Sequence, residues 1–290
     1  MSWLEAVLLG LLQGLTEFLP VSSSGHLLIG KELLGVELPD DESFLSFEVI
    51  VHAATVLATI VVFRKQIWQL LCGLFKFKYN DQTDYVLKIA VSMLPVLVVG
   101  LFFKDKVTAL FDGLTVVGWT LLVTAVLLFC SDTFSFDKLL SRKVRRGRTP
   151  DTAAPQAGEG PRGGISYWQA FVVGLGQAVA VLPGLSRSGT TISTGLLCGV
   201  KRSVMAQFSF LMVLVPILGE AFLDIIGGGL SESAAAIGAL PLALGFVSAF
   251  LSGLFACRVM IALVKKASLK WFALYCAIVA AAILIHTYCF

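Results

Sequence analysis

WLEAVLLGLLQGLTEFLPVSSSGHLLIGKELLG, residues 3 to 35, is apolar at both ends and polar in its middle. The polar centre contains a glutamate, Pro20, three consecutive serines and a histidine. Because proline disfavours the interior of a helix, this stretch is more naturally two short helices than one long helix. Residues 167 to 199 have the same character, with a proline, a glycine and a charged residue between two apolar ends. These two broken stretches decide the fold.

The composition of the whole chain places it in lipid. Of its 290 residues, 57% are hydrophobic and only 14% are charged, with a mean hydropathy of +0.87, whereas soluble proteins carry about 25% charged residues. A helix needs roughly 20 mostly apolar residues to cross a bilayer. Six runs meet this requirement: Phe47 to Phe63, Val86 to Phe103, Leu114 to Cys130, Val204 to Ile226, Ala236 to Cys257 and Trp271 to Tyr288.

The two broken stretches are predicted to be re-entrant helix hairpins, because irregular backbone at membrane depth is tolerated only inside protein or along a wet cavity. They also resemble each other. At a spacing of 164 residues, five polar or small residues of the first stretch match five of the second: Gly10 and Gly174, Gln13 and Gln177, Ser22 and Ser186, Ser24 and Ser188, Gly25 and Gly189. The matches indicate an internal repeat.

Positive charge fixes the expected topology, since loops rich in Lys and Arg face the cytoplasm. These residues concentrate after Phe63, in residues 131–164, at Lys201 and Arg202, and in residues 258–270. Consecutive loops alternate between the two sides of the membrane if both broken stretches are re-entrant. The first stretch then enters the membrane from outside and the second from the cytoplasm. We therefore predict an all-α, polytopic inverted repeat with six full transmembrane helices and two re-entrant hairpins. The repeats comprise residues 1–130 and 165–290, and residues 131–164 form a cytoplasmic linker.

Several alternatives are not favoured by the composition. A net charge of +3, carried in short loops between apolar runs, gives no reason to expect a nucleic acid partner. The six cysteines lack metal-ligand spacing, and no removable signal peptide is expected at the N-terminus. Membrane lipid is the expected surrounding, and a homodimer is compatible with the sequence.

The first polar motif places acid, hydroxyl and imidazole groups together. Gln13 and Glu17 are four residues apart and share a helix face, and a carboxylate in a membrane segment costs about 3 kcal/mol and by default marks function. Beyond Pro20, the next helix is expected to begin with side chains and N–H groups that suit an anion: Ser22, Ser23, Ser24, Gly25 and His26.

The second motif is centred on Arg187, the only basic residue far from an expected loop. A guanidinium group binds phosphate oxygens through two parallel hydrogen bonds. Its neighbours at a predicted helix N-terminus are expected to complete an anion nest: Ser186, Ser188, Gly189, Thr190 and Thr191.

Further polar residues are candidates for a supporting role. Glu48 and His52 are four residues apart in the third apolar segment, so they either face the site or form a plain pair near the helix end. Gln177, the counterpart of Gln13, is predicted to support the site in the same way.

The two motifs together resemble the signatures of the undecaprenyl-diphosphate phosphatase (bacitracin-resistance) family. The similarity lies in TEFLPVSSSGH, residues 16–26, and PGLSRSGTT, residues 183–191, and extends over the whole chain. It implies a hydrolase that removes one phosphate from undecaprenyl diphosphate at the outer face of the bacterial cytoplasmic membrane, regenerating the lipid carrier for cell-wall synthesis. By position, the resemblance assigns function to Glu17, Ser23, His26, Ser186 and Arg187.

The resemblance also implies a divalent cation, with Mg²⁺ expected and Ca²⁺ as the alternative, held by Glu17 and Gln13. Gln13 stands where many members have a second glutamate, which leaves Glu17 as the expected acid or base. Three nucleophiles are open: Ser23, which we favour, His26, or a water molecule. The rival hypothesis is a polyprenyl-phosphate flippase or transporter, because inverted repeats of broken helices are a known transporter design.

Overall fold

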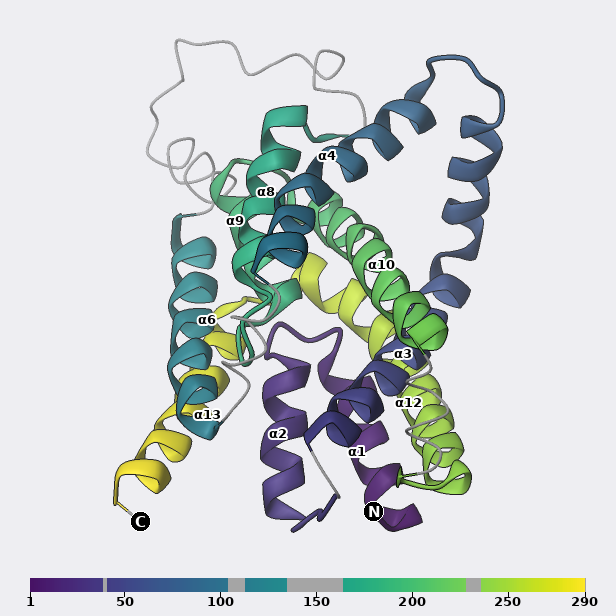
Figure 1. Cartoon of the computed structure of the whole chain (residues 1–290). Coiled ribbons are helices and arrows are strands. Elements are labelled where there is room, and N and C mark those ends of the chain that lie inside the picture. The colour runs from purple at the N-terminus through teal and green to yellow at the C-terminus, as the bar shows by residue number, and fades with distance from the viewer. Residues whose placement is uncertain (39–40, 104–112, 135–163, 228–235, 290) are drawn as a thin grey trace.

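A computed structural model describes residues 1–38, 41–103, 113–134, 164–227 and 236–289 (Figure 1). The secondary structure of these residues is entirely helical, as predicted. The helices are α1 (Trp3–Thr16), α2 (Ser23–Leu33), α3 (Asp41–Leu74), α4 (Asp81–Phe102), α6 (Leu114–Phe134), α8 (Tyr167–Val179), α9 (Arg187–Leu197), α10 (Arg202–Gly227), α12 (Ala239–Lys266) and α13 (Lys270–Cys289).

Six of the described helices are long and apolar enough to cross a membrane: α3, α4, α6, α10, α12 and α13. These are the six predicted spans, so the chain is a polytopic membrane protein. Some helices extend beyond the apolar runs. At 34 residues α3 is the longest, and at 1.5 Å per residue it is about 50 Å long, well over the roughly 30 Å of a hydrocarbon core.

The two broken stretches each fold into a pair of short helices, and their ends are fixed by serine caps. Ser2 and Ser166 form capping boxes at the starts of α1 and α8. Ser22 and Ser186 cap α2 and α9, and each hydroxyl accepts a hydrogen bond from the N–H of a glycine three residues later. Both pairs of capping serines are 164 residues apart, so the spacing found in the sequence also relates the helix starts.

Glycines allow the short helices to pack closely against distant parts of the chain. A Cβ atom on Gly10 of α1 would lie 2.2 Å from the carbonyl oxygen of Gly245 in α12. A Cβ atom on Gly174 of α8 would lie 2.2 Å from the carbonyl oxygen of Ser92 in α4. Each broken pair is therefore docked on a long helix from the other half of the sequence, while α6 packs against α13.

The turns of the two broken pairs approach each other in the middle of the molecule (Figure 1). The α1–α2 pair comes from the end of the molecule where the N-terminus lies, and the α8–α9 pair comes from the opposite end. The inverted repeat of residues 1–130 and 165–290 stays a prediction. The predicted linker begins too early, because residues 131–134 are still part of α6; residues 135–163 lie outside the described residues.

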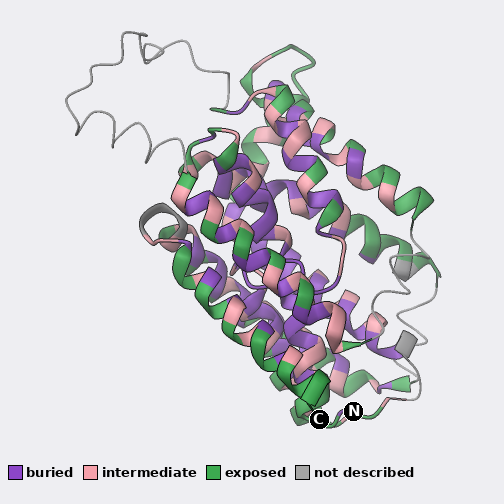
Figure 2. Cartoon of the chain, turned by 90° about the vertical axis from the view of Figure 1, so that its left-hand side faces the viewer, coloured by how far each residue is buried: buried purple, intermediate pink, exposed green. Residues whose placement is uncertain are grey.

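Buried residues are concentrated along the centre of the molecule, and exposed residues lie on its periphery (Figure 2). The exposed side chains include many large apolar ones, such as Trp168, Phe102 and Trp271, as expected for surfaces that contact lipid. Polar side chains of both broken pairs lie in the buried centre, among them Gln13, Ser23, His26 and Ser186.

Candidate active site

The two turns are in direct contact. The hydroxyl of Ser188, at the start of α9, donates a hydrogen bond to the carbonyl oxygen of Leu19 in the first turn (3.3 Å). The second turn is also held by α6, because Thr120 donates to the carbonyl oxygen of Pro183 (2.6 Å) and Thr124 accepts from the N–H of Ser186 (3.2 Å). The two sequence motifs therefore form one site.

Gly184 allows this contact because no other residue fits its conformation and its surroundings. Its φ is +80°, a region that L side chains rarely adopt. A Cβ atom there would lie 2.2 Å from the hydroxyl of Thr120. Gly25 is close to the same place, since a Cβ on Gly25 would lie 3.1 Å from the Cα of Gly184.

Glu17, directly after α1, is the centre of a polar cluster. One carboxylate oxygen, Oε2, accepts hydrogen bonds from the amide of Gln13 (2.9 Å) and from the hydroxyl of Ser23 (2.5 Å). The same oxygen lies 3.2 Å from Nε2 of His52 in α3. Gln13 and Glu17 share a helix face, as predicted from their spacing.

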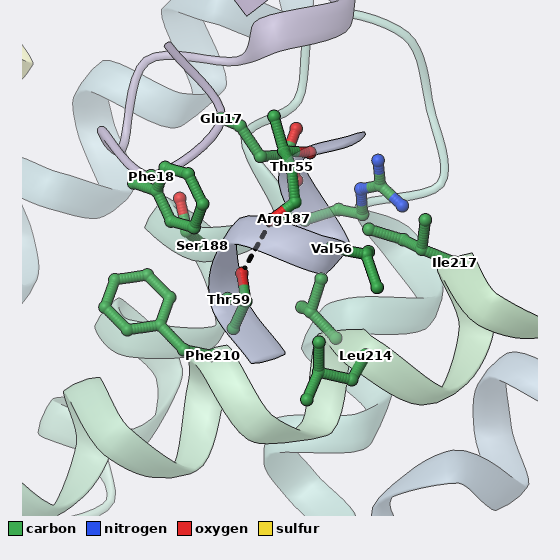
Figure 3. A pocket seen from close by; sticks show the side chains of 11 residues that line it. Glu17, Phe18, Thr55, Val56, Thr59, Arg187, Ser188, Phe210, Leu214 and Ile217 are labelled. Atoms are coloured by element: carbon green, nitrogen blue, oxygen red, sulfur yellow. Dashed lines mark hydrogen bonds between the residues drawn. The ribbon is translucent and has the colours of Figure 1, made fainter. Parts of the chain in front are cut away.

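Arg187 is the first residue of α9 and lines a pocket together with Glu17 (Figure 3). No carboxylate among the described residues lies within salt-bridge distance of its guanidinium, so this cation is available to an anionic ligand. The pocket is narrow, with a cavity volume of about 20 Å³.

The pocket is polar on one side and apolar on the other. Figure 3 shows Glu17 and Arg187 on one side, with Phe210 and Leu214 of α10 on the other. Hydroxyl-bearing residues of α3 and α9 and further apolar residues complete the lining: Thr55, Thr59, Ser188, Phe18, Val56, Val213 and Ile217. The arrangement suits a ligand with an anionic head and an apolar tail.

The N-termini of α2 and α9 lie at the site and add partial positive charge. Ser22, the N-cap of α2, has a φ of +71°, which is a strained conformation for a residue other than glycine. Ser186, the N-cap of α9, has an ordinary φ of −65°. The first turn thus stores strain that the second turn does not.

His26 lies in α2 beside the site, but its ring nitrogens contact groups other than Glu17. Nδ1 is 2.7 Å from the carbonyl oxygen of Ser22, and Nε2 is 2.7 Å from the hydroxyl of Tyr275 in α13. The two rings are also stacked, with centroids 5.6 Å apart. His26 is therefore fully hydrogen-bonded in this arrangement.

Most of the predicted phosphate-binding residues lie at the two helix starts, where they bond to one another. The hydroxyls of Ser22 and Ser24 are 3.5 Å apart, as are those of Ser186 and Ser188 at 3.4 Å. The hydroxyl of Thr191 is 2.6 Å from that of Ser209. These contacts order both helix starts.

At several of the predicted positions, buried polar atoms have no hydrogen-bond partner among the residues that the structure describes. They include Oε1 of Gln13, Oε2 of Glu48, both amide atoms of Gln177 and the hydroxyl of Thr190. Glu48 lies beside His52, with its other oxygen 4.0 Å from Nδ1 of that ring. Gln177 has no polar contact with the pocket residues.

Two features of the site were not identified from the sequence. Tyr275 carries no motif that marks it as a partner of a histidine 249 residues away. The apolar side of the pocket is built from α10 residues such as Phe210 and Leu214, which look like any lipid-facing residues in the sequence. The sequence did contain a signal for His52, its four-residue spacing from Glu48. That spacing could not decide whether His52 faces the site or forms a plain pair with Glu48 near the helix end.

The chain is similar to known proteins over almost its whole length. A family model described as bacitracin resistance protein BacA matches residues 6–282. A protein of Bacteroides thetaiotaomicron named undecaprenyl-diphosphatase is 50% identical over 287 residues, covering 98% of this chain and 99% of the relative. Proteins of the same name from Parabacteroides distasonis and Christiangramia forsetii are 51% and 46% identical and cover 96% and 98% of both chains.

Proposed function

Since this chain belongs to the bacitracin resistance protein BacA family, we propose that it is an undecaprenyl-diphosphatase. It removes the terminal phosphate of undecaprenyl diphosphate and regenerates the monophosphate carrier that cell-wall synthesis uses, which confers resistance to bacitracin. The observation that carries this proposal is the meeting of Glu17 and Arg187, from two distant motifs, at a pocket with an apolar wall, with Ser23 hydrogen-bonded to Glu17.

Arg187 and the two helix N-termini supply the binding site for the diphosphate. Phosphoryl transfer depends mostly on positioning and on stabilising charge at the phosphate oxygens. A guanidinium without a carboxylate partner suits that task, because its positive charge is not already neutralised. The serines that cap α2 and α9 hold these helix starts in place, since each accepts a hydrogen bond from the N–H of a glycine in the first turn.

Ser23 is the nucleophile that the geometry favours. Its O–H donates to Glu17 at 2.5 Å, so the carboxylate is in place to take the proton as the serine oxygen attacks the terminal phosphorus. A new P–O bond forms to Ser23 while the bond from that phosphorus to the bridging oxygen breaks, and the lipid monophosphate leaves. Water then hydrolyses the phosphoserine. Direct attack by water, with Glu17 as base, is the alternative.

The oxygen atoms around Glu17 fit a divalent cation such as Mg²⁺, with Ca²⁺ as the alternative. No cluster of three or more His, Cys, Asp or Glu side chains occurs among the described residues. However, Mg²⁺ commonly binds one or two carboxylates together with substrate phosphates. Glu17 and the unpartnered Oε1 of Gln13 would hold the ion, which when bound would neutralise charge on the phosphate oxygens.

The proposed location is the bacterial cytoplasmic membrane, with the site open to the outer face. The basic loops support this orientation, since they place α8–α9 on the cytoplasmic side and α1–α2 on the outer side. In this topology both short pairs are re-entrant hairpins.

The proposal is tested with protein purified in detergent and supplied with polyprenyl diphosphate and Mg²⁺. Wild type should release phosphate, and Glu17→Ala and Arg187→Ala should each lower the rate at least a hundredfold, because each removes a charge that acts in the transition state. Glu37→Gln, a charge change in the exposed α2–α3 loop, serves as the control. Near-normal turnover by either alanine variant would contradict the proposal, and activity that survives a chelator would exclude the cation.

A polyprenyl-phosphate flippase is the second candidate, favoured by the opposed approach of the two broken pairs (Figure 1). The detergent assay separates the two functions, since a transporter without hydrolase activity releases no phosphate when no membrane is present.

A further inference from the structure

The hydrogen bonds of His26 fix the tautomer of its ring. The carbonyl oxygen of Ser22, 2.7 Å from Nδ1, only accepts hydrogen bonds, so Nδ1 carries a hydrogen. In a neutral imidazole Nε2 then has a lone pair, and the hydroxyl of Tyr275, 2.7 Å away, donates to it. Both nitrogens are used, and neither has a free lone pair for attack on phosphorus or for taking a proton from Ser23.

We infer that Tyr275 is a positioning residue that acts through His26 to hold the strained first turn, so that Ser23 stays directed at Glu17. This inference rests on the proposed function and adds a residue that neither sequence motif contains. Under it, His26 contributes through Nδ1–H and is neither the nucleophile nor the base.

The strain at Ser22 requires such a restraint. A non-glycine residue in a sparsely populated backbone region costs about 1–3 kcal/mol and persists only where its surroundings over-determine it. The carbonyl oxygen of Ser22 receives two hydrogen bonds from the same residue, one from the backbone N–H of His26 (3.2 Å) and one from its ring (2.7 Å). The ring itself is held by stacking on Tyr275 and by its hydroxyl.

The strained turn connects directly to the chemistry. Ser22 precedes Ser23, whose hydroxyl donates to Glu17 at 2.5 Å. A relaxation of φ at Ser22 would rotate the start of α2 and move that hydroxyl. A continuous set of contacts therefore runs from Tyr275 in α13 to the carboxylate of Glu17 after α1.

The second turn provides an internal comparison. At the same spacing of 164 residues, Val181 occupies the position of Glu17 and Thr190 occupies that of His26. There the N-cap Ser186 is unstrained, with a φ of −65°, and the hydroxyl of Thr190 has no hydrogen-bond partner in the described part of the chain. The strain at Ser22 and the contact of His26 with Tyr275 thus occur together, in the turn that carries Glu17.

The position of Tyr275 strengthens its bond to His26. Its side chain is 44% exposed on a helix apolar enough to span the membrane. Where hydrocarbon surrounds this helix, the phenol has no competing partner, which favours the contact with Nε2.

The experiment begins with Tyr275→Phe, which keeps the stacked ring and removes only the hydroxyl. We expect kcat for phosphate release to fall about tenfold with KM unchanged, because losing a single hydrogen bond of ordinary strength corresponds to roughly that factor. Tyr288→Phe makes the same chemical change at an exposed position of the same helix and should behave as wild type.

The His26 variants separate positioning from chemistry. His26→Asn keeps an N–H close to the place of Nδ1 and removes Nε2, so it should retain clearly more activity than His26→Ala. In either His26 background Tyr275→Phe should have no further effect, since residues that act in series are not additive.

Three results would overturn the inference: a wild-type kcat in Tyr275→Phe, an additional loss from Tyr275→Phe in the His26→Ala background, or equal inactivity of His26→Asn and His26→Ala. Thermal unfolding in detergent shows whether each variant is folded. An inactive wild type would instead contradict the proposed function, so the two failures are distinguishable.

Discussion

At the scale of single residues, the site depends on one carboxylate oxygen with three neighbours. Oε2 of Glu17 accepts from Gln13 and Ser23 and lies 3.2 Å from Nε2 of His52. His52 is itself fixed, since its Nδ1 is 2.8 Å from the carbonyl oxygen of Glu48. Its imidazole thus limits the directions in which the carboxylate can turn.

His52→Leu should therefore lower kcat for phosphate release by about tenfold, because Glu17 loses a fixed polar neighbour in a buried site. His52→Gln should retain most of the activity, since the glutamine amide nitrogen reaches close to the position of Nε2. Steady-state kinetics on the two variants check this, with His286→Leu in the last turn of α13 as the control. If His52→Leu turns over like wild type, the contact with Glu17 has no role in positioning.

Much of the site was predictable at this scale, and the reason is chemical. Glu17 and Arg187 are conspicuous because charged side chains in membrane segments are costly and rarely lack a function. The partnership of His26 with Tyr275 was not predictable, since tyrosine is common in membrane helices. The strain at Ser22 also leaves no trace in the sequence, because positive φ is usually signalled by glycine.

At the scale of helices, glycine positions decide which helices pack together. Without a hydrophobic force between helices in lipid, close backbone approach at small residues is what holds them. Gly10 and Gly174 each lie against a backbone carbonyl of a helix from the other half of the chain. The sequence repeat marked both glycines, but it did not identify α12 and α4 as the partners, because apolar helices resemble one another.

Gly10→Ala and Gly174→Ala should each lower the midpoint of thermal unfolding in detergent by several degrees. In both cases the new Cβ would lie 2.2 Å from a carbonyl oxygen, and overpacking of this kind costs about 1–3 kcal/mol. Gly100→Ala is the matched control, since no atom of the described residues lies within 4 Å of its Cβ position and alanine favours helix. Equal midpoints for all three variants would contradict the close approach of α1 and α8 to their partners.

At the scale of the whole molecule, the six spans followed from length and hydropathy because the bilayer sets both. The arrangement of those spans around the site did not, since it depends on contacts between residues more than 150 positions apart, such as Gly10 with Gly245. The topology was inferred from the positive charge of the loops. It assigns each loop to one side of the membrane, and cysteine labelling can test these assignments.

Single cysteines at three exposed positions in a variant without its own cysteines test the first hairpin. If α1 and α2 re-enter from outside, a membrane-impermeant thiol reagent should label Ser2→Cys and Glu37→Cys on intact cells, because exposed thiols react as thiolates. Lys78→Cys, between α3 and α4, should be labelled only after the membrane is permeabilised.

The same experiment tests the second hairpin through Lys201→Cys, between α9 and α10. A hairpin that enters from the cytoplasm places this residue on the same side as Lys78, so both should be protected in intact cells. Were α1 and α2 a single broken span instead, Ser2 and Glu37 would lie on opposite sides, and only one of them would be labelled. Opposite labelling of Ser2 and Glu37 therefore excludes the re-entrant arrangement and, with it, the approach of the two turns from opposite faces of the membrane.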